Sequence, residues 1–150
     1  MPILLYQQSN VEIFWHEDQW LHVRWIGNQN LGEVKRDCEQ LLRLLAAKNA
    51  NSVLYDLSLV ENPVSGLSDW AAREWFPKMR GAGLQFFAWL YSPTRFVQVP
   101  PDAAMEAGMP GRARIFDNPE DAKDWLRANR QRVKARTQRI ILPPNWRREH

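Results

Sequence analysis

The stretch that decides the fold runs from Val53 to Ser68 and has the sequence VLYDLSLVENPVSGLS. Its first part, Val53–Leu57, is a short apolar segment with an acidic residue, Asp56, near its end, which is typical of a buried strand. The polar residues that follow predict a loop. Ser68, followed by Asp69, predicts the N-terminus of a helix, because serine caps helices and a carboxylate in the first turn suits the helix dipole. The order strand, loop, helix indicates a layered α/β protein.

Composition favours one domain in a reducing environment. The chain has 150 residues, 45% of them hydrophobic and 25% charged, and it contains a single cysteine, Cys38. This length is typical of one domain, and one cysteine excludes an internal disulfide. The N-terminus lacks the basic region of a signal peptide, and no apolar stretch reaches the roughly 20 residues of a membrane span. We therefore expect a cytoplasmic protein without a membrane span.

The charge is distributed unevenly along the chain. Residues 1–126 carry 12 Lys and Arg against 16 Asp and Glu, whereas residues 127–150 carry 8 against 1. We therefore divide the chain into a domain, residues 1–129, and a basic C-terminal tail, residues 130–150. Such a tail predicts weak, salt-dependent contact with polyanions. Its basic residues are evenly spaced, so no single helical face is basic, and we expect an adaptable segment rather than a helix that reads a groove.

Two alternating segments, Val11–His16 and Trp20–Ile26, predict a β-hairpin. A three-residue loop, 17–19, places six apolar residues on one face through the pairs Val11–Trp25, Ile13–Val23 and Trp15–Leu21, and it sets Glu12 opposite Arg24. Phe14 and Trp20 then emerge on the other face, which predicts a covered patch. Three elements could cover this patch: the segment Ile3–Gln7, the end of the chain, or a second protomer. A second protomer would make Phe14 and Trp20 the face of a homodimer.

The remaining elements complete a mixed sheet. Residues 32–48 follow the 3.6-residue period of an amphipathic helix, and the helix after Ser68 should kink or loosen near Phe76, because Pro77 lacks an N–H. The apolar run Leu84–Tyr91 predicts a central strand buried on both faces. A short strand at 114–116 and a helix beginning at Asn118 follow. The predicted fold is α/β, a mixed β-sheet of about five strands with helices packed against it, and Ile3–Gln7 is a candidate for a further short strand.

Several of these segments together resemble the SpoIIAA-like branch of the STAS superfamily, the fold of anti-sigma-factor antagonists. The segments that carry the resemblance are Leu54–Leu57, Glu74–Pro77, Ala82–Trp89, Ser92-Pro93 and Phe116–Leu126. They span roughly residues 3–127. The resemblance implies that the loop before the second helix is a partner-binding surface. In well-understood STAS regulators a serine there is phosphorylated. Val64 falls at that position here, which leaves Ser65 or Ser68 as displaced acceptors.

The resemblance implies a non-enzymatic interaction or regulatory module that binds a protein partner through the loop 57–68. The expected partner-binding residues are Asp56, Ser58, Glu61, Asn62, Ser65, Gly66 and Ser68. The wider STAS and SEC14-like group resembles lipid-binding domains, which implies an alternative function as carrier or sensor of a small apolar, lipid-like ligand. The expected pocket for that ligand is aromatic and consists of Trp70, Trp75, Phe86, Phe87 and Trp89.

No other pattern in the sequence predicts chemistry. His16 and His22 are diagonal neighbours that lack a third metal ligand. Cys38 lies on the apolar stripe of a helix without a basic neighbour, which indicates a core residue rather than a nucleophile. Gly81 and Gly83 precede a strand, the reverse of the order in a nucleotide-binding loop. Asp56 would brace its loop or, as the alternative, meet a ligand at the end of the strand. We therefore expect no metal, no cofactor and no enzymatic activity.

Overall fold

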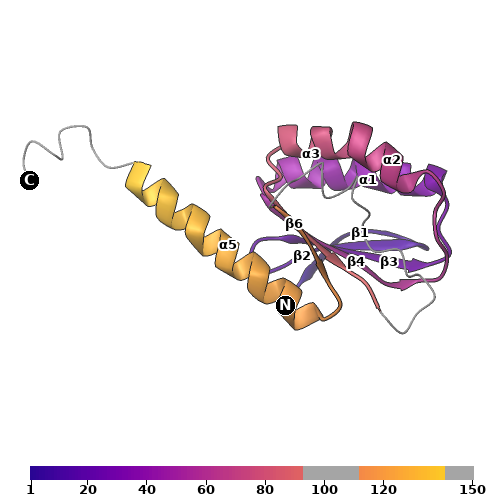
Figure 1. The fold of residues 1–150 in the computed structure, drawn as a ribbon, viewed down its shortest axis with the longest axis horizontal. Helices are drawn as coiled ribbons and strands as arrows, with labels where there is room; N and C mark the ends of the chain where they lie inside the picture. Colours follow the sequence, from indigo (N-terminus) through magenta and orange to yellow (C-terminus); the bar gives the residue numbers. More distant parts are fainter. Residues whose placement is uncertain (93–111, 141–150) are drawn as a thin grey trace, which may run out of the picture.

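The computed structural model describes residues 1–92 and 112–140, which form a six-stranded mixed sheet with helices on both faces (Figure 1). The strands are β1 (Ile3–Gln8), β2 (Val11–Trp15), β3 (Leu21–Gly27), β4 (Ser52–Val60), β5 (Phe86–Leu90) and β6 (Ala113–Phe116). The helices are α1 (Leu31–Ala47), α2 (Leu67–Trp70), the π-helix η1 (Ala71–Trp75), α3 (Phe76–Gly81) and α5 (Pro119–Ile140). The α/β prediction is confirmed. There are six strands rather than about five, because β1 adds an edge strand.

The strands lie in the sheet in the order of the chain, from β1 to β6. The first three are antiparallel, and β3 to β6 are parallel. Parallel neighbours need crossover connections. Helix α1 makes the crossover from β3 to β4, and α2, η1 and α3 make the next one, from β4 to β5. The connection from β5 to β6, which includes Pro93 of the predicted motif, lies outside the described residues.

The hairpin register agrees with the prediction. Val11 pairs with Trp25, Ile13 with Val23, and Trp15 with Leu21. Glu12 and Arg24 also face each other, with 3.7 Å between Oε1 and Nε. The loop closes with a 2.9 Å hydrogen bond from the His16 N–H to the Trp20 carbonyl. Because side chains alternate along a strand, this register fixes which face of the hairpin is buried.

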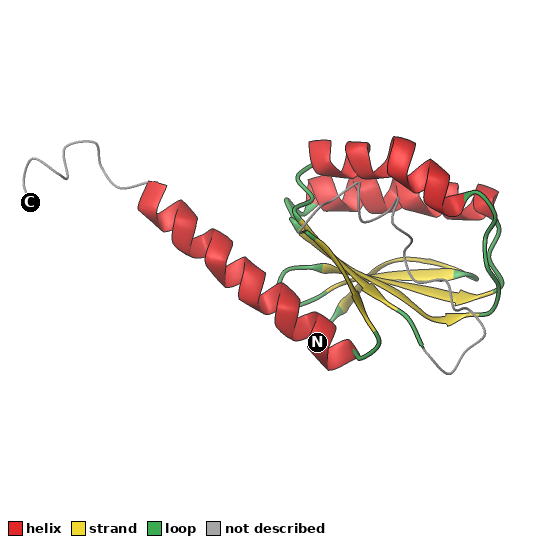
Figure 2. Ribbon diagram, in the orientation of Figure 1, coloured by secondary structure: helices red, strands yellow, loops and turns green. Residues whose placement is uncertain are grey.

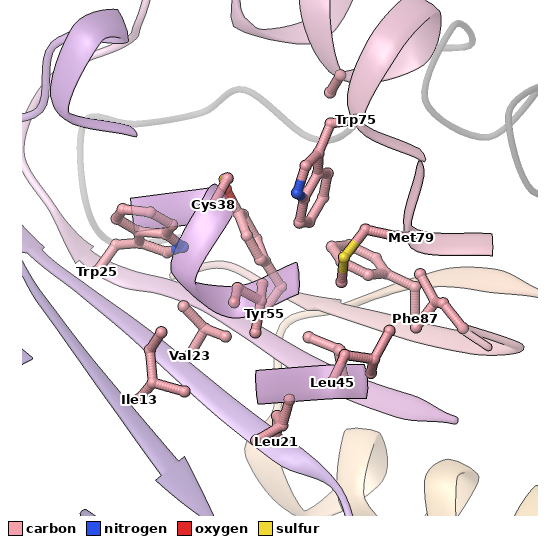
Figure 3. Packing of buried hydrophobic residues seen from close by; sticks show 14 of the residues in the cluster. Ile13, Leu21, Val23, Trp25, Cys38, Leu45, Tyr55, Trp75, Met79 and Phe87 are labelled. Carbon is pink, nitrogen blue, oxygen red and sulfur yellow. The ribbon is translucent and has the colours of Figure 1, made fainter. Parts of the chain in front are cut away.

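The first hydrophobic core lies between the sheet and the layer formed by α1, α2, η1 and α3 (Figure 2). Figure 3 shows Tyr55 in the middle of this core, with Trp25 on one side and Phe87 on the other. Their ring centroids lie 5.6 Å and 5.1 Å from that of Tyr55. Cys38 is fully buried here, and burial raises the pKa of its thiol far above the usual range. Cys38 is therefore a core residue, as predicted.

The helical segment after Gly66 changes its winding where proline predicts a break. η1 covers Ala71–Trp75 and passes directly into α3, in which Pro77 occupies the first turn. Proline has no N–H for the usual hydrogen bond, so the preceding turn widens. The loosened turn predicted near Phe76 is thus confirmed.

Strand β5 pairs with both β4 and β6 and is buried on both faces. Phe87 and Trp89 belong to the first core, whereas Ala88 and Leu90 face the other side of the sheet. The prediction that this strand is central needs a correction. β3 and β4 are the middle strands, because β1 and β2 lie on one side of them and β5 and β6 on the other, so β5 is an interior strand next to the edge strand β6.

The second core lies under α5, on the opposite face of the sheet (Figure 2). Ala122 and Leu126 of α5 are fully buried against Leu54 and Leu90. The helix begins with an Asn118 cap, whose Oδ1 accepts hydrogen bonds from the two backbone N–H groups at positions 120 and 121, at 2.8 Å and 3.2 Å. A capped start and an apolar stripe explain why this helix forms here.

Two predictions about this side of the molecule are wrong. Trp20 does not form an exposed dimer face, because α5 buries it to 1% exposure and Arg127 of α5 lies 5.6 Å from the centre of its ring. The chain also does not become an adaptable segment after Asn129. α5 continues to Ile140 and projects beyond the sheet (Figure 1). Within residues 1–92 and 112–140, no helix is long and apolar enough to cross a membrane.

Candidate functional site

An apolar pocket of about 70 Å³ opens at the end of the sheet where β4 gives way to the loop before α2. Trp25, Tyr55 and Trp89 line it from the sheet, and Asn62 and Val64 line it from the loop. Gln29, Val34, Leu57, Val60, Pro63, Leu67 and Ser68 complete the wall. The pocket therefore lies at the carboxyl ends of parallel strands, where open α/β sheets bind their ligands.

Two of the tryptophans that line the pocket have buried donors without acceptors. Trp25 and Trp89 are 1% and 4% exposed, and neither indole Nε1–H has a hydrogen-bond partner among the described residues. A buried N–H without a partner costs on the order of 1–3 kcal/mol. A molecule or side chain that enters the pocket with a correctly placed acceptor would recover part of that cost.

Asn62 fixes the loop over the pocket. Its Oδ1 accepts a 2.7 Å hydrogen bond from the Gln29 N–H, and its Nδ2 donates a 2.8 Å hydrogen bond to the Gln29 carbonyl. The Gln29 side chain in turn donates to the Asn10 and Ile26 carbonyls. Asn62 was predicted as a partner contact. The structure shows that it also holds the loop to the β3–α1 connection.

The hydrogen bonds continue to a buried carboxylate, Asp37. It accepts from Tyr6 Oη at 2.8 Å, Asn10 Nδ2 at 3.0 Å and Arg36 Nε at 3.0 Å. Burial, and then the nearby Asp37 carboxylate, raises the pKa of the Tyr6 phenol. A fully buried carboxylate needs such partners, since an unpaired charge would be very costly. This cluster joins β1 to α1 and supports the pocket from behind. The sequence offered no motif for it.

The segment before α2 differs in detail from the prediction, because β4 continues to Val60 and the connection between β4 and α2 covers only residues 61–66 of the expected loop 57–68. α2 begins at Leu67, and the residue before it, Gly66, has a φ of 81°, a conformation that favours glycine. Ser68 is therefore not the N-cap. It lies inside the first turn and lines the pocket wall, whereas Ser65 and Glu61 are exposed and do not line the pocket.

Asp56 and Ser58 lie on the other face of the sheet, away from the pocket. Asp56 accepts from the Ser58 N–H at 2.9 Å and from Ser58 Oγ at 2.6 Å, and its Oδ2 lies 3.2 Å from His22 Nε2. Burial alone would raise the pKa of this carboxyl, but the hydrogen bonds from His22 and Ser58 outweigh burial and lower it. Asp56 lies in the middle of β4, which continues to Val60, so it braces β4 and His22 of β3 rather than the loop that it was expected to brace.

The Asp56 cluster has the wrong geometry for nucleophilic catalysis. A Ser–His–acid triad places the histidine between the serine and the acid. Here Asp56 lies between His22 and Ser58, so the imidazole cannot take the proton of the hydroxyl. His16 is engaged elsewhere, stacked on Trp20 with 4.2 Å between ring centroids. Among the described residues no group of three or more His, Cys, Asp or Glu side chains could hold a metal ion.

The predicted aromatic ligand pocket does not exist as one cavity. Of its five residues, Trp89 alone lines the pocket described above. Trp75 and Phe87 are packed in the first core, and Trp70 lies half-buried beside Trp75. Phe86 lies across the sheet, with its ring 6.0 Å from that of Trp125. The prediction failed because neighbouring residues on a strand, such as Phe86 and Phe87, point to opposite faces.

Comparison with known proteins supports the fold. No protein-family model matches the chain, and no curated protein does. A crystal structure of an uncharacterised protein from Shewanella loihica PV-4, described as a DUF3478 family member with a SpoIIAA-like fold, is similar with a TM-score of 0.52. The two chains share 18% sequence identity, and the match covers 84% of this chain and 92% of the other. With its six strands and two cores, this chain has a SpoIIAA-like α/β fold.

Proposed function

We propose that this protein is a non-enzymatic interaction module that binds a protein partner through the loop 57–68. The observation that carries the proposal is the apolar pocket beneath this loop. Its volume of about 70 Å³ is well below the ~300–1,000 Å³ of sites for drug-sized molecules, and it suits one apolar side chain. A side chain anchored in a desolvated pocket is the commonest origin of strong binding at protein interfaces.

The surroundings of the pocket favour binding over catalysis. Its lining contains no Asp, Glu, His, Lys, Arg or Cys, and burial raises the pKa of Tyr55 well above its ordinary value. No lining group can therefore take up or release a proton near neutral pH. The Asn62–Gln29 hydrogen bonds hold the rim in place before a partner arrives, which reduces the ordering cost of binding.

Quantitative pull-down from the native host tests this function. Val64→Glu puts a charge on the pocket wall, and Glu61→Lys reverses an exposed charge in the same loop. Arg43→Glu, on the exposed side of α1, is the matched charge control. We expect wild type and Arg43→Glu to recover the same partner, and both loop variants to lose most of it while their unfolding curves stay close to wild type. Equal recovery by all four proteins would contradict the proposal.

A second candidate function is carriage or sensing of a small apolar ligand. The two unpartnered indole N–H groups of Trp25 and Trp89 favour a ligand with an apolar body and one hydrogen-bond acceptor. The pocket limits that body to a few carbon atoms unless the loop moves. Native mass spectrometry of freshly purified protein should then show a bound mass that Trp89→Phe weakens. A wild-type protein that consistently shows no added mass would speak against this candidate.

We further propose that the protein is a cytoplasmic homodimer. The buried, unpaired Cys38 suits a reducing compartment. The dimer argument now depends on Phe14 without Trp20. Phe14, which is half-buried, pairs with Leu4 of the edge strand β1, and Leu4 is 45% exposed. Two apolar side chains on an open sheet face favour a second copy as their cover.

A further inference from the structure

The distal part of α5 combines a projecting backbone with charges of one sign. Residues 130–140 carry Arg130, Arg132, Lys134, Arg136 and Arg139 and no acidic residue. They continue the helix that packs on β4, β5 and β6, and they lead away from the sheet (Figure 1). A helical arm whose sequence carries five basic residues is thus attached at one end to the part of α5 in the second core.

The helix arranges these positions in two rows. An α-helix turns about 100° per residue, so positions 130 and 134 lie on one side of the axis. Positions 132, 136 and 139 lie on the other side, roughly 170° away by the same geometry. Between the two rows, on the side away from the sheet contacts, come Gln131, Ala135 and Gln138, which are uncharged. The even spacing that suggested an adaptable tail therefore means two opposite basic rows once the segment is helical.

We propose that this arm binds double-stranded DNA by lying in the major groove, with one basic row toward each phosphate backbone. A helix with its side chains is about 10–12 Å across, and the major groove of B-DNA is about 12 Å wide. Both walls of the groove are negatively charged, which matches charge on two opposite sides of a helix. The uncharged middle strip would face the base edges.

Two other polyanions fit this arrangement less well. A helix that lies on an anionic membrane needs one apolar face with large side chains opposite its basic face. The segment 130–140 contains no aromatic residue and no leucine. Double-stranded RNA has a major groove too deep and narrow for side chains to reach. Charge on opposite sides of one helix therefore favours DNA.

The charge count sets the expected salt dependence. If all five basic residues contact phosphates, the slope of log K against log salt concentration approaches about −4.5, since each contact contributes about −0.9. Affinity would then fall roughly 500-fold between 50 and 200 mM salt. Loss of two contacts from either row should reduce the slope to about −2.7.

Fluorescence anisotropy of the full chain with a labelled 24-base-pair duplex tests the proposal. The variants are Arg130→Gln with Lys134→Gln, and Arg132→Gln with Arg136→Gln, since glutamine retains good helix propensity. Arg43→Gln with Arg80→Gln removes two exposed charges from the helix layer on the opposite face of the sheet and serves as the control. We expect each arm variant to weaken duplex binding at least tenfold at 100 mM salt, and the control to change it less than twofold. Arg132→Lys with Arg136→Lys should retain binding.

Several outcomes would overturn the groove model. One is an effect confined to a single row, because it would indicate contact on one side only. Tighter binding to the single strand, or to vesicles containing phosphatidylserine, would assign the arm to those partners instead. If the full-length protein showed no measurable affinity for the duplex at 50 mM salt, the arm would not be a DNA-binding element. Circular dichroism of each variant checks that the helix remains.

Discussion

Asn62 binds the backbone of Gln29 at both its N–H and its carbonyl, at 2.7 Å and 2.8 Å, across 33 positions of the chain. One side-chain amide thus makes the two backbone hydrogen bonds that a neighbouring strand would otherwise make. The contact matters because both residues line the pocket, so the shape of the rim depends on it.

Asn62→Ala should lower the free energy of unfolding by about 1–3 kcal/mol, because it leaves two backbone groups at Gln29 without partners. Urea denaturation at neutral pH measures the loss. Glu61→Gln, one residue earlier and exposed, should change stability by less than about 0.5 kcal/mol. If the two variants proved equally stable, the amide of Asn62 would not be holding the loop.

Amide hydrogen exchange should be slow in the interior strand β5 and fast in the edge strand β1. Ala88 and Leu90 lie on a strand that is paired on both sides and covered by a core on each face, so their amides should exchange only at close to the global unfolding free energy. Amides of the edge strand β1, where Ile3 is 58% exposed, should exchange much faster. Comparable exchange in both strands would contradict the observed strand order.

Acid should weaken the attachment of α5 through His16. Burial lowers the pKa of this imidazole below its ordinary 6.5, against the smaller opposing effect of Asp18. The unfolded chain therefore takes up the proton first, and stability falls as pH drops below about 6.5. Protonation also conflicts with the 3.1 Å hydrogen bond that His16 Nδ1 accepts from the Asp18 N–H.

The measurement for His16 is the free energy of unfolding between pH 7 and pH 5. His16→Phe keeps an aromatic ring against Trp20 and removes the titration, so its stability should change less over this range than that of wild type. The pKa values of Asp18 and Asp56 are lowered from 3.8, so their loss of stability comes only at more acid pH. Parallel curves for the two proteins would exclude His16 as the source.

The dimer proposal predicts a change of mass in solution. Phe14→Glu places a charge in the patch that Phe14 forms with Leu4, so sedimentation velocity should show a shift from dimer to monomer. Arg43→Glu should leave the dimer intact. Two results would contradict the proposal. One is a wild-type protein that sediments as a monomer at the same concentrations, and the other is a Phe14→Glu variant that still sediments as a dimer.

Short-range patterns predicted most of the fold. The hairpin register followed from strict alternation, because a three-residue loop puts Ile13 and Val23 on the same face, whereas a two-residue loop would mix the faces. The loosened turn near Phe76 followed from a single proline. These features depend on a few neighbouring residues, so the sequence was sufficient to predict them.

The site could not be predicted in the same way. The pocket combines Trp25, Val34, Tyr55 and Trp89, which come from four separate elements, and no local pattern brings them together. The His22–Asp56 contact depends on the parallel register that pairs His22 with Leu54 and Arg24 with Asp56, which no local pattern indicates. The length of α5 differs from the prediction for another reason. Arginine and lysine favour helices, but residues 130–140 are so polar that their pattern is more typical of a tail.

The agreement between strand order and chain order has a consequence for how the molecule assembles. Each new strand finds its partner in the strand just made, so the sheet can grow from one edge during synthesis, with contacts that span little sequence. The second core is different. Trp20 is made early, but its cover, Leu126, follows about a hundred residues later. Until α5 is made, Trp20, Leu54 and Leu90 on this face of the sheet lack their cover, and α5 is therefore the element that completes the second core.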